Sequence, residues 1–193
     1  MIVQAAFIAA LAGSHAAAQT TNYVSKGNLE SKNDLACAGG LSNKYTPADL
    51  FKGVARCITS EDYERTLLPH MLAFAYGLYD QARVADESAH EAIPALNMEL
   101  SQSLDPAKLT KYNELRTAFA HDKRRQKAAC ARLRRIGKPD YFPTYMIQHG
   151  MGAFTGTKGD DGIVPGFNGK TAWEKVLTVS MHCESARPES TRP

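Results

Sequence analysis

The chain has 193 residues, of which 44% are hydrophobic and 22% charged, and its formal net charge is +3. This composition is ordinary for a globular protein and excludes a wholly disordered chain. About 175 residues remain once an N-terminal targeting segment is set aside, which is enough for one domain with its own hydrophobic core.

Residues 1–18 have the features of a secretory signal peptide. The first 20 residues contain no Asp, Glu, Lys or Arg, and an apolar run covers residues 5–12. Ala16-Ala17-Ala18 fits the small-x-small rule for cleavage before Gln19, and a second such site lies two residues earlier. The apolar run is far shorter than the span of about 20 residues that crosses a membrane. We therefore expect an exported protein, periplasmic or extracellular, without a transmembrane segment in its mature chain.

The four cysteines are even in number and widely spaced, at Cys37, Cys57, Cys130 and Cys183. They form no C-x-x-C pair and no Cys/His spacing of the zinc-finger kind. In an exported chain this pattern predicts two disulfides, and three pairings are open. We favour Cys37 with Cys57 and Cys130 with Cys183, because each bridge then links neighbours in sequence. A free catalytic thiolate is the competing interpretation.

Residues 19–45 are polar and glycine-rich, and we expect an extended N-terminal arm ahead of a helical domain over residues 46–184. Thr46-Pro47 joins a cap residue to a proline in the first turn, which predicts that the first helix begins there. A second helix begins near Ser60, and Pro69 either kinks it or starts a new one.

The middle of the chain predicts three more helical stretches. Residues 71–79 carry no charge on any face, which is typical of a buried helix. Asp86 opens the next stretch, and Asp105-Pro106 repeats the cap-plus-proline signal. The helix that begins there is expected to be the longest, running to Ile136 before Gly137 stops it.

The last third of the chain alternates loops with short helices. A short helix is expected within residues 141–154, a glycine-rich loop over residues 150–169 and a final helix over residues 171–183, with a disordered tail at residues 185–193. We find no strand pattern. The predicted fold class is all-α: a single compact helical domain of about six or seven helices, stapled by two disulfides.

A dense basic cluster near the end of the longest predicted helix is the first candidate site. On a continuous helix, Phe119, Leu133 and Ile136 fall on one arc and nearly all basic residues on the opposite one, which is typical of a solvated face. An acidic protein partner or an anionic envelope surface is the functional alternative. No aromatic side chain lies between Phe119 and Tyr141 to stack on bases, so we do not expect nucleic acid. The cluster comprises Lys123, Arg124, Arg125, Lys127, Arg132, Arg134, Arg135 and Lys138.

The triplet Gly169-Lys170-Thr171 precedes a helix as the end of a phosphate-binding P-loop does. The full pattern requires glycine at position 164, where this chain has Val164. We therefore expect Asn168 or Thr171 to cap the last helix instead.

Two further groups of residues are candidate metal or catalytic sites. Glu87 and His90 share a helix face, but helical carboxylate metal sites use two E-x-x-H pairs and this chain has one. We expect local ion pairs there, among Arg83, Asp86, Glu87, His90 and Glu91. His149, Asp160 and Asp161 would form a site only if they converged, and an exposed loop is the simpler expectation. We predict no cofactor, metal or catalytic residue.

The sequence contains no complete catalytic pattern. The first hypothesis is therefore an exported helical interaction protein without catalytic activity, such as an inhibitor, an immunity-type protein or an envelope assembly partner. Its partner would be another envelope or secreted protein, with an acidic protein as one candidate. The alternatives are a small-molecule or metal-binding helical protein and, less favoured, an envelope hydrolase.

Overall fold

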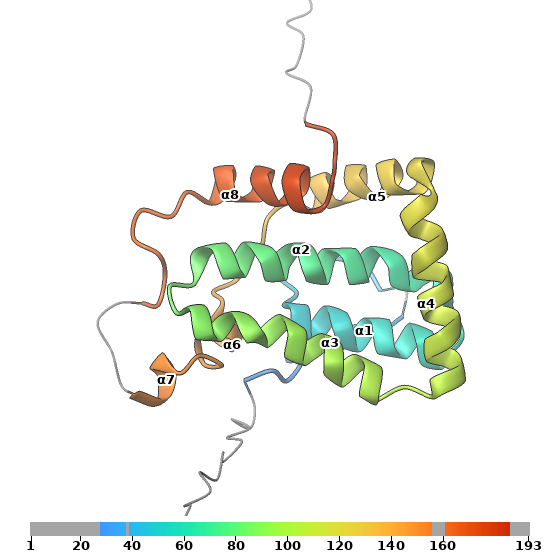
Figure 1. Ribbon diagram of the computed structural model, residues 1–193, viewed down its shortest axis with the longest axis horizontal. Helices are drawn as coiled ribbons and strands as arrows, with labels where there is room; N and C mark the ends of the chain where they lie inside the picture. The colour runs from blue at the N-terminus through green and yellow to red at the C-terminus, as the bar shows by residue number, and fades with distance from the viewer. Residues whose placement is uncertain (1–27, 38, 156–160, 186–193) are drawn as a thin grey trace, which may run out of the picture.

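The structure is a computed structural model that describes residues 28–37, 39–155 and 161–185 (Figure 1). Within these residues all regular secondary-structure elements are helices. The single β contact among them is an isolated antiparallel bridge between Val84 and Ile163. The all-α prediction is confirmed. The predicted signal peptide and the tail from residue 186 lie outside the described residues.

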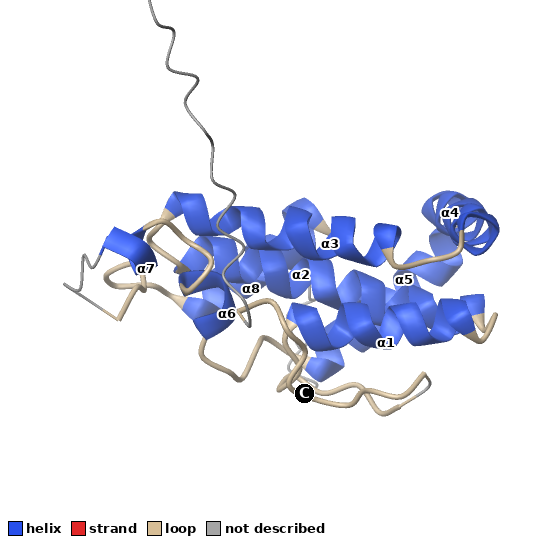
Figure 2. Ribbon diagram, turned by 90° about the horizontal axis from the view of Figure 1, so that it is seen from below, coloured by secondary structure: helices blue, strands red, loops and turns tan. Residues whose placement is uncertain are grey.

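Three helices form the first layer of the fold: α1 (Pro47–Thr59), α2 (Leu67–Arg83) and α3 (Ala92–Gln102). The helix α4 (Pro106–His121) crosses one end of this layer, and α5 (Lys123–Ile136) turns back along the side of α2 that faces away from α3 (Figures 1 and 2).

Three short helices complete the fold. The single-turn helices α6 (Thr144–Ile147) and α7 (Gly152–Thr155) lie at the end opposite α4, where one short helix was expected. The last helix, α8 (Gly169–Lys175), packs on α2 and continues into a π-helical turn, Val176–Ser180. It begins two residues before the predicted start.

The core is built around α2, as its uncharged middle predicts. Leu72, Ala73, Ala75 and Tyr76 are fully buried. The ring of Tyr76 lies 5.7 Å from that of Trp173 on α8, so α2 and α8 meet through an aromatic contact. The charge-free stretch is therefore helical and central, although some of its side chains are only partly buried.

The predicted helix start at Thr46 is confirmed. The side chain of Thr46 accepts a hydrogen bond from the backbone N–H of Asp49, and the Asp49 carboxylate accepts from the backbone N–H of Thr46, which together make a capping box. A helix also begins at Pro106, where Asp105 accepts from two backbone N–H groups. Gly137, with a φ of 86°, ends α5 as predicted.

Two other helix boundaries differ from the prediction. A 3-10 turn, Tyr63–Thr66, stands where the second helix was expected to begin, and α2 starts at Leu67, so that Pro69 lies in its first turn and kinks nothing. The expected single helix from Pro106 to Ile136 is broken at Asp122, which has an extended ψ of 92° and caps α5 by accepting from the backbone N–H of Arg125. The longest helix is α2.

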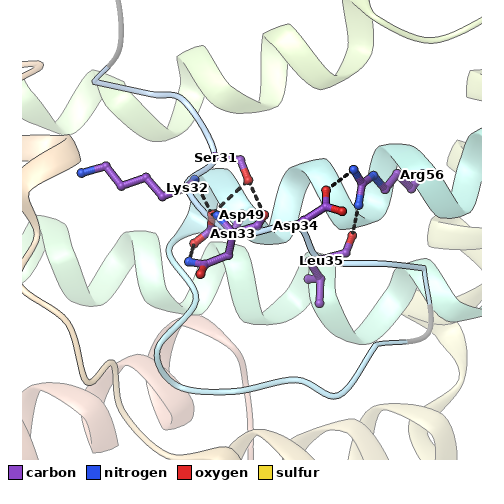
Figure 3. Close-up of polar contacts among 7 residues, drawn as sticks. All are labelled: Ser31, Lys32, Asn33, Asp34, Leu35, Asp49 and Arg56. Atoms are coloured by element: carbon purple, nitrogen blue, oxygen red, sulfur yellow. Dashed lines mark hydrogen bonds and ion pairs between the residues drawn. The ribbon is translucent and has the colours of Figure 1, made fainter.

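The described residues ahead of α1, 28–37 and 39–46, form no helix but are anchored to the domain (Figure 3). The buried carboxylate of Asp49 accepts hydrogen bonds from the backbone N–H groups of Lys32 and Asn33, each at 2.8 Å. Leu35 is buried against Gly53 of α1. Ordered packing therefore begins well before Thr46.

Both disulfides pair as predicted. Cys37 is bonded to Cys57 and Cys130 to Cys183, with Cα–Cα distances of 4.8 and 5.6 Å. The first bridge ties the N-terminal segment to α1, and the second ties the end of the chain to α5. Across the described part of the chain, none of the helices combines the length and apolar character that a membrane crossing requires.

Candidate functional site

Six of the eight basic residues of the cluster fall into two sets, and the first set makes structural contacts. Arg134 binds Glu174 of α8 through both carboxylate oxygens at 2.9 Å and donates to the backbone oxygen of Glu184 at 2.7 Å. Lys127 pairs with the Glu184 carboxylate at 3.4 Å, and Arg125 pairs with Glu64. These contacts fasten α5 to its neighbours and leave little charge for a partner.

The second set faces solvent along the outer side of α5. Arg124, Arg135 and Lys138 are exposed, and none of them forms an ion pair with a carboxylate of the described residues. The exposed small residues Ala128 and Ala131 lie between them at helical spacing, so the stripe is flat and accessible. Arg124 and Arg135 lie about 16 Å apart along the helix, at 1.5 Å per residue, and Lys138 lies two residues beyond the end of α5.

The apolar side of α5 points into the domain, as the helical spacing of its apolar residues predicts. Ala129 and Leu133 are buried, while Cys130 and Ile136 are partly buried. The predicted phase does not carry over to α4, because the break at Asp122 changes the direction of the chain. Two basic residues belong to neither set. Arg132 lies on the flank of α5, where it borders a cleft, and Lys123, at the start of α5, donates to the side-chain oxygen of Gln126 at 3.3 Å.

The loop hypothesis around His149 gains no support. His149 Nδ1 lies 3.4 Å from the side-chain nitrogen of Asn28, and burial lowers its pKa. Asp161 accepts from the backbone N–H of Ile163 in its own loop. Asp160 lies outside the described residues. The structure records no contact between His149 and Asp161, so it does not bring these two together as a catalytic pair.

The group around Glu87 and His90 also has a structural role. Asp86 accepts from the backbone N–H of Ser88 in a 3-10 turn, Glu87–Glu91, and from that of Gly152 at 2.8 Å. His90 Nε2 lies 3.2 Å from the backbone oxygen of Val84. Among the described residues no three His, Cys, Asp or Glu side chains are grouped to hold a metal ion.

The Gly169-Lys170-Thr171 triplet forms the first turn of α8. The side chain of Asn168 accepts from the backbone N–H of Thr171 at 3.0 Å, which is the cap that the sequence predicted.

Sequence reasoning missed a buried polar cluster at the end of α2. The Asp80 side chain is fully buried and binds Arg83 Nε at 2.8 Å. The hydroxyl groups of Tyr141 and Tyr145 each donate to its second oxygen at 2.8 Å. Burial raises the pKa of Asp80 to about 6, against the opposing effect of the Arg83 charge. Since the carboxylate is shielded from solvent, the cluster fastens the segment before α6, and α6 itself, to the end of α2.

Comparison of the chain with known protein families, with curated proteins and with solved structures finds no match. The fold thus defines a class, the disulfide-linked all-α domains, and the candidate site is the outer face of α5.

Proposed function

We propose that this chain is an exported helical interaction protein without catalytic activity, and that it binds an acidic partner protein through the outer face of α5. The observation that carries the proposal is the division of the basic cluster. Arg124 and Arg135 on α5, and Lys138 just beyond its end, have no carboxylate partner among the described residues, whereas Arg134 and Arg125 of the same helix do. Unpaired surface charges of one sign steer an oppositely charged partner and fix its orientation.

The two disulfides support the location that the proposal assumes. Such bonds persist in oxidising compartments and are rare in the cytosol. A direct test is the intact mass of the chain purified from its native compartment without reductant. We expect a chain beginning near Gln19 with all four cysteines bonded. An uncut chain with free thiols would contradict export.

The binding test compares two variants with the same net charge. In the first, Arg124→Glu and Arg135→Glu reverse two outward charges of α5. In the second, Lys44→Glu and Lys111→Glu reverse two exposed charges elsewhere, on residues that are also without an ion pair in the described part of the chain. Each variant and the native protein are used to capture proteins from the envelope fraction, and captured proteins are quantified by mass spectrometry.

We expect one acidic protein to be captured by the native chain and by the Lys44/Lys111 variant, and to fall at least tenfold with the Arg124/Arg135 variant. Its capture should also weaken as salt rises from 50 to 300 mM, because exposed charges are screened. Equal capture by all three chains, or binding of α5 to anionic vesicles in place of a protein, would overturn the proposal.

A further inference from the structure

A cleft of about 300 Å³ opens on the flank of α5, away from the outer face of that helix. Its walls come from Leu35, Ala36, Gly39 and Leu41 ahead of α1, from α1, from the start of α2 with the turn before it, and from α5. The lining combines the apolar side chains of Leu35, Leu41, Leu68 and Pro69 with the charged side chains of Glu64, Arg65 and Arg132.

The walls of the cleft are fixed by the fold. Leu35 packs so closely on Gly53 that a Cβ there would lie 2.7 Å from a methyl carbon of Leu35. The Cys37–Cys57 disulfide holds the same segment on α1, and Cys57 itself borders the cleft. A site formed before its ligand arrives loses less entropy on binding, which favours affinity.

Two guanidinium groups border this apolar space. Arg132 is exposed and has no carboxylate partner among the residues that the structure describes. Arg65 uses its Nε to bind Asp62 at 3.0 Å. The one acidic residue in the lining, Glu64, is already paired with Arg125. The cleft therefore presents an excess of positive charge beside an apolar wall.

We propose that this cleft binds a small monocarboxylic acid with an apolar tail. The tail would pack against the partly exposed side chains of Leu41 and Leu68, and the carboxylate would pair with Arg132, assisted by Arg65. Arginine matches a carboxylate because its planar fork donates two parallel hydrogen bonds. The volume is at the lower end of the range for small-molecule sites, which fits a short tail and excludes a nucleotide. This site is independent of the outer face of α5, since it uses none of Arg124, Arg135 and Lys138.

The test uses octanoate as the probe and the full mature chain with both disulfides intact. Binding is measured by calorimetry and by NMR shifts of the amides that border the cleft. We expect octanoate to bind at least tenfold more tightly than octanol or octylamine, because only the acid combines the tail with a negative charge. Equal affinity for the three probes, or no binding of octanoate, would overturn the proposal.

Two variants test separately how the Arg132 charge and the open space of the cleft contribute to octanoate binding. Arg132→Gln should weaken octanoate binding at least tenfold, whereas Arg124→Gln, on the outer face of the same helix, should leave it unchanged. Ala36→Trp fills the cleft from its exposed rim and should abolish binding without disturbing the core. An effect of Arg124→Gln equal to that of Arg132→Gln would show a diffuse charge effect and contradict the site.

A final comparison distinguishes a free acid from the C-terminus of a polypeptide. A tetrapeptide that ends in leucine is titrated with its carboxylate free and with the carboxylate amidated. We expect neither form to compete with octanoate. Displacement of octanoate by the free-acid peptide alone would replace the proposed ligand with a peptide C-terminus. Loss of capture in the α5 experiment would leave the octanoate result unaffected, so the two proposals fail separately.

Discussion

At the scale of single residues, Asp80 shows how a charged group is accommodated in the core. Its two oxygens receive the Arg83 guanidinium and the hydroxyl groups of Tyr141 and Tyr145, and Arg83 also stacks 5.1 Å from the centre of the Tyr79 ring. Removing one member of such a network leaves the others buried without a partner, which costs about 3–5 kcal/mol for an ion pair. The cluster therefore holds the end of α2 and the segment after α5 in one arrangement.

The pKa of Asp80 leads to a pH-dependent prediction. Burial raises this pKa from 3.8 to about 6, so the folded state holds the proton more tightly than the unfolded state. The stabilising effect of that proton is complete below pH 4 and is lost as the pH rises through 6. The whole shift corresponds to about 3 kcal/mol, at about 1.4 kcal/mol per pKa unit. Because the unfolded carboxyl is already partly ionised at pH 4, the free energy of unfolding of the native chain should fall by about 2 kcal/mol relative to Asp80→Asn between pH 4 and pH 7.

Urea unfolding of both chains at the two pH values measures this difference. The comparison with Asp80→Asn removes the effect of His70, because that buried histidine is common to both chains. The pKa of His70 is lowered by burial to about 3, so its own contribution to stability is lost as the pH falls below 6.5. A difference between the native chain and Asp80→Asn that stays constant, or grows with pH, would show that Asp80 titrates at or below its ordinary pKa.

At the scale of helices, the boundary between α4 and α5 depends on one side chain. Asp122 accepts from the backbone N–H of Arg125, and Gln126 donates from its side chain to the backbone oxygen of Phe119 at 3.1 Å. These two contacts satisfy groups that each helix leaves unpaired at its end. The chain can therefore turn here without a proline or glycine.

We expect Asp122→Ala to reduce the free energy of unfolding by about 1 kcal/mol, the usual effect of losing an N-cap. Urea unfolding measures the change, with Asp140→Ala as the control, because the exposed Asp140 side chain caps none of the described helices. If residues 106–136 formed one continuous helix, alanine at position 122 would stabilise the chain, since alanine has the highest helix propensity. The sign of the change thus distinguishes a capped break from a continuous helix.

The helices show which local signals in the sequence are reliable. Thr46-Pro47, Asp105-Pro106 and Gly137 are correct boundary signals because a cap acts within a single turn. The break at Asp122 was missed because aspartate is also tolerated within helices and neither proline nor glycine accompanies it. The anchoring of residues 28–45 was missed because it depends on Asp49, which by sequence looks like an ordinary first-turn acid.

Contacts between distant parts of the chain were harder to predict. Asp80 lies 61 and 65 residues before its tyrosine partners, and no local pattern links these positions. The division of the basic cluster also required the structure, because Glu64 and Glu174 approach α5 from opposite directions in the chain. The disulfide pairing was predicted because chain proximity alone favoured it.

At the scale of the whole molecule, the two disulfides close the chain at both ends of the domain. The Cys37–Cys57 bridge spans 20 residues and fastens the segment before α1, whereas the Cys130–Cys183 bridge spans 53 residues and fastens the end of α8 and its π-helical turn to α5. Neither bridge includes a residue of α2, the helix at the centre of the core.

We expect the bridge over the longer loop to contribute more to stability. Restricting the unfolded chain favours folding by an amount that grows with loop length, about 3.3 kcal/mol for the Cys37–Cys57 loop and about 4.2 kcal/mol for the Cys130–Cys183 loop. Each bridge is removed by replacing both of its cysteines with alanine, and urea unfolding is followed by the fluorescence of Trp173. Loss of the second bridge should lower the free energy of unfolding by about 1 kcal/mol more than loss of the first, with Trp173 still buried in both folded variants. The reverse order would show that the N-terminal segment, held by Asp49 and Leu35, contributes more to the fold than the C-terminal helix.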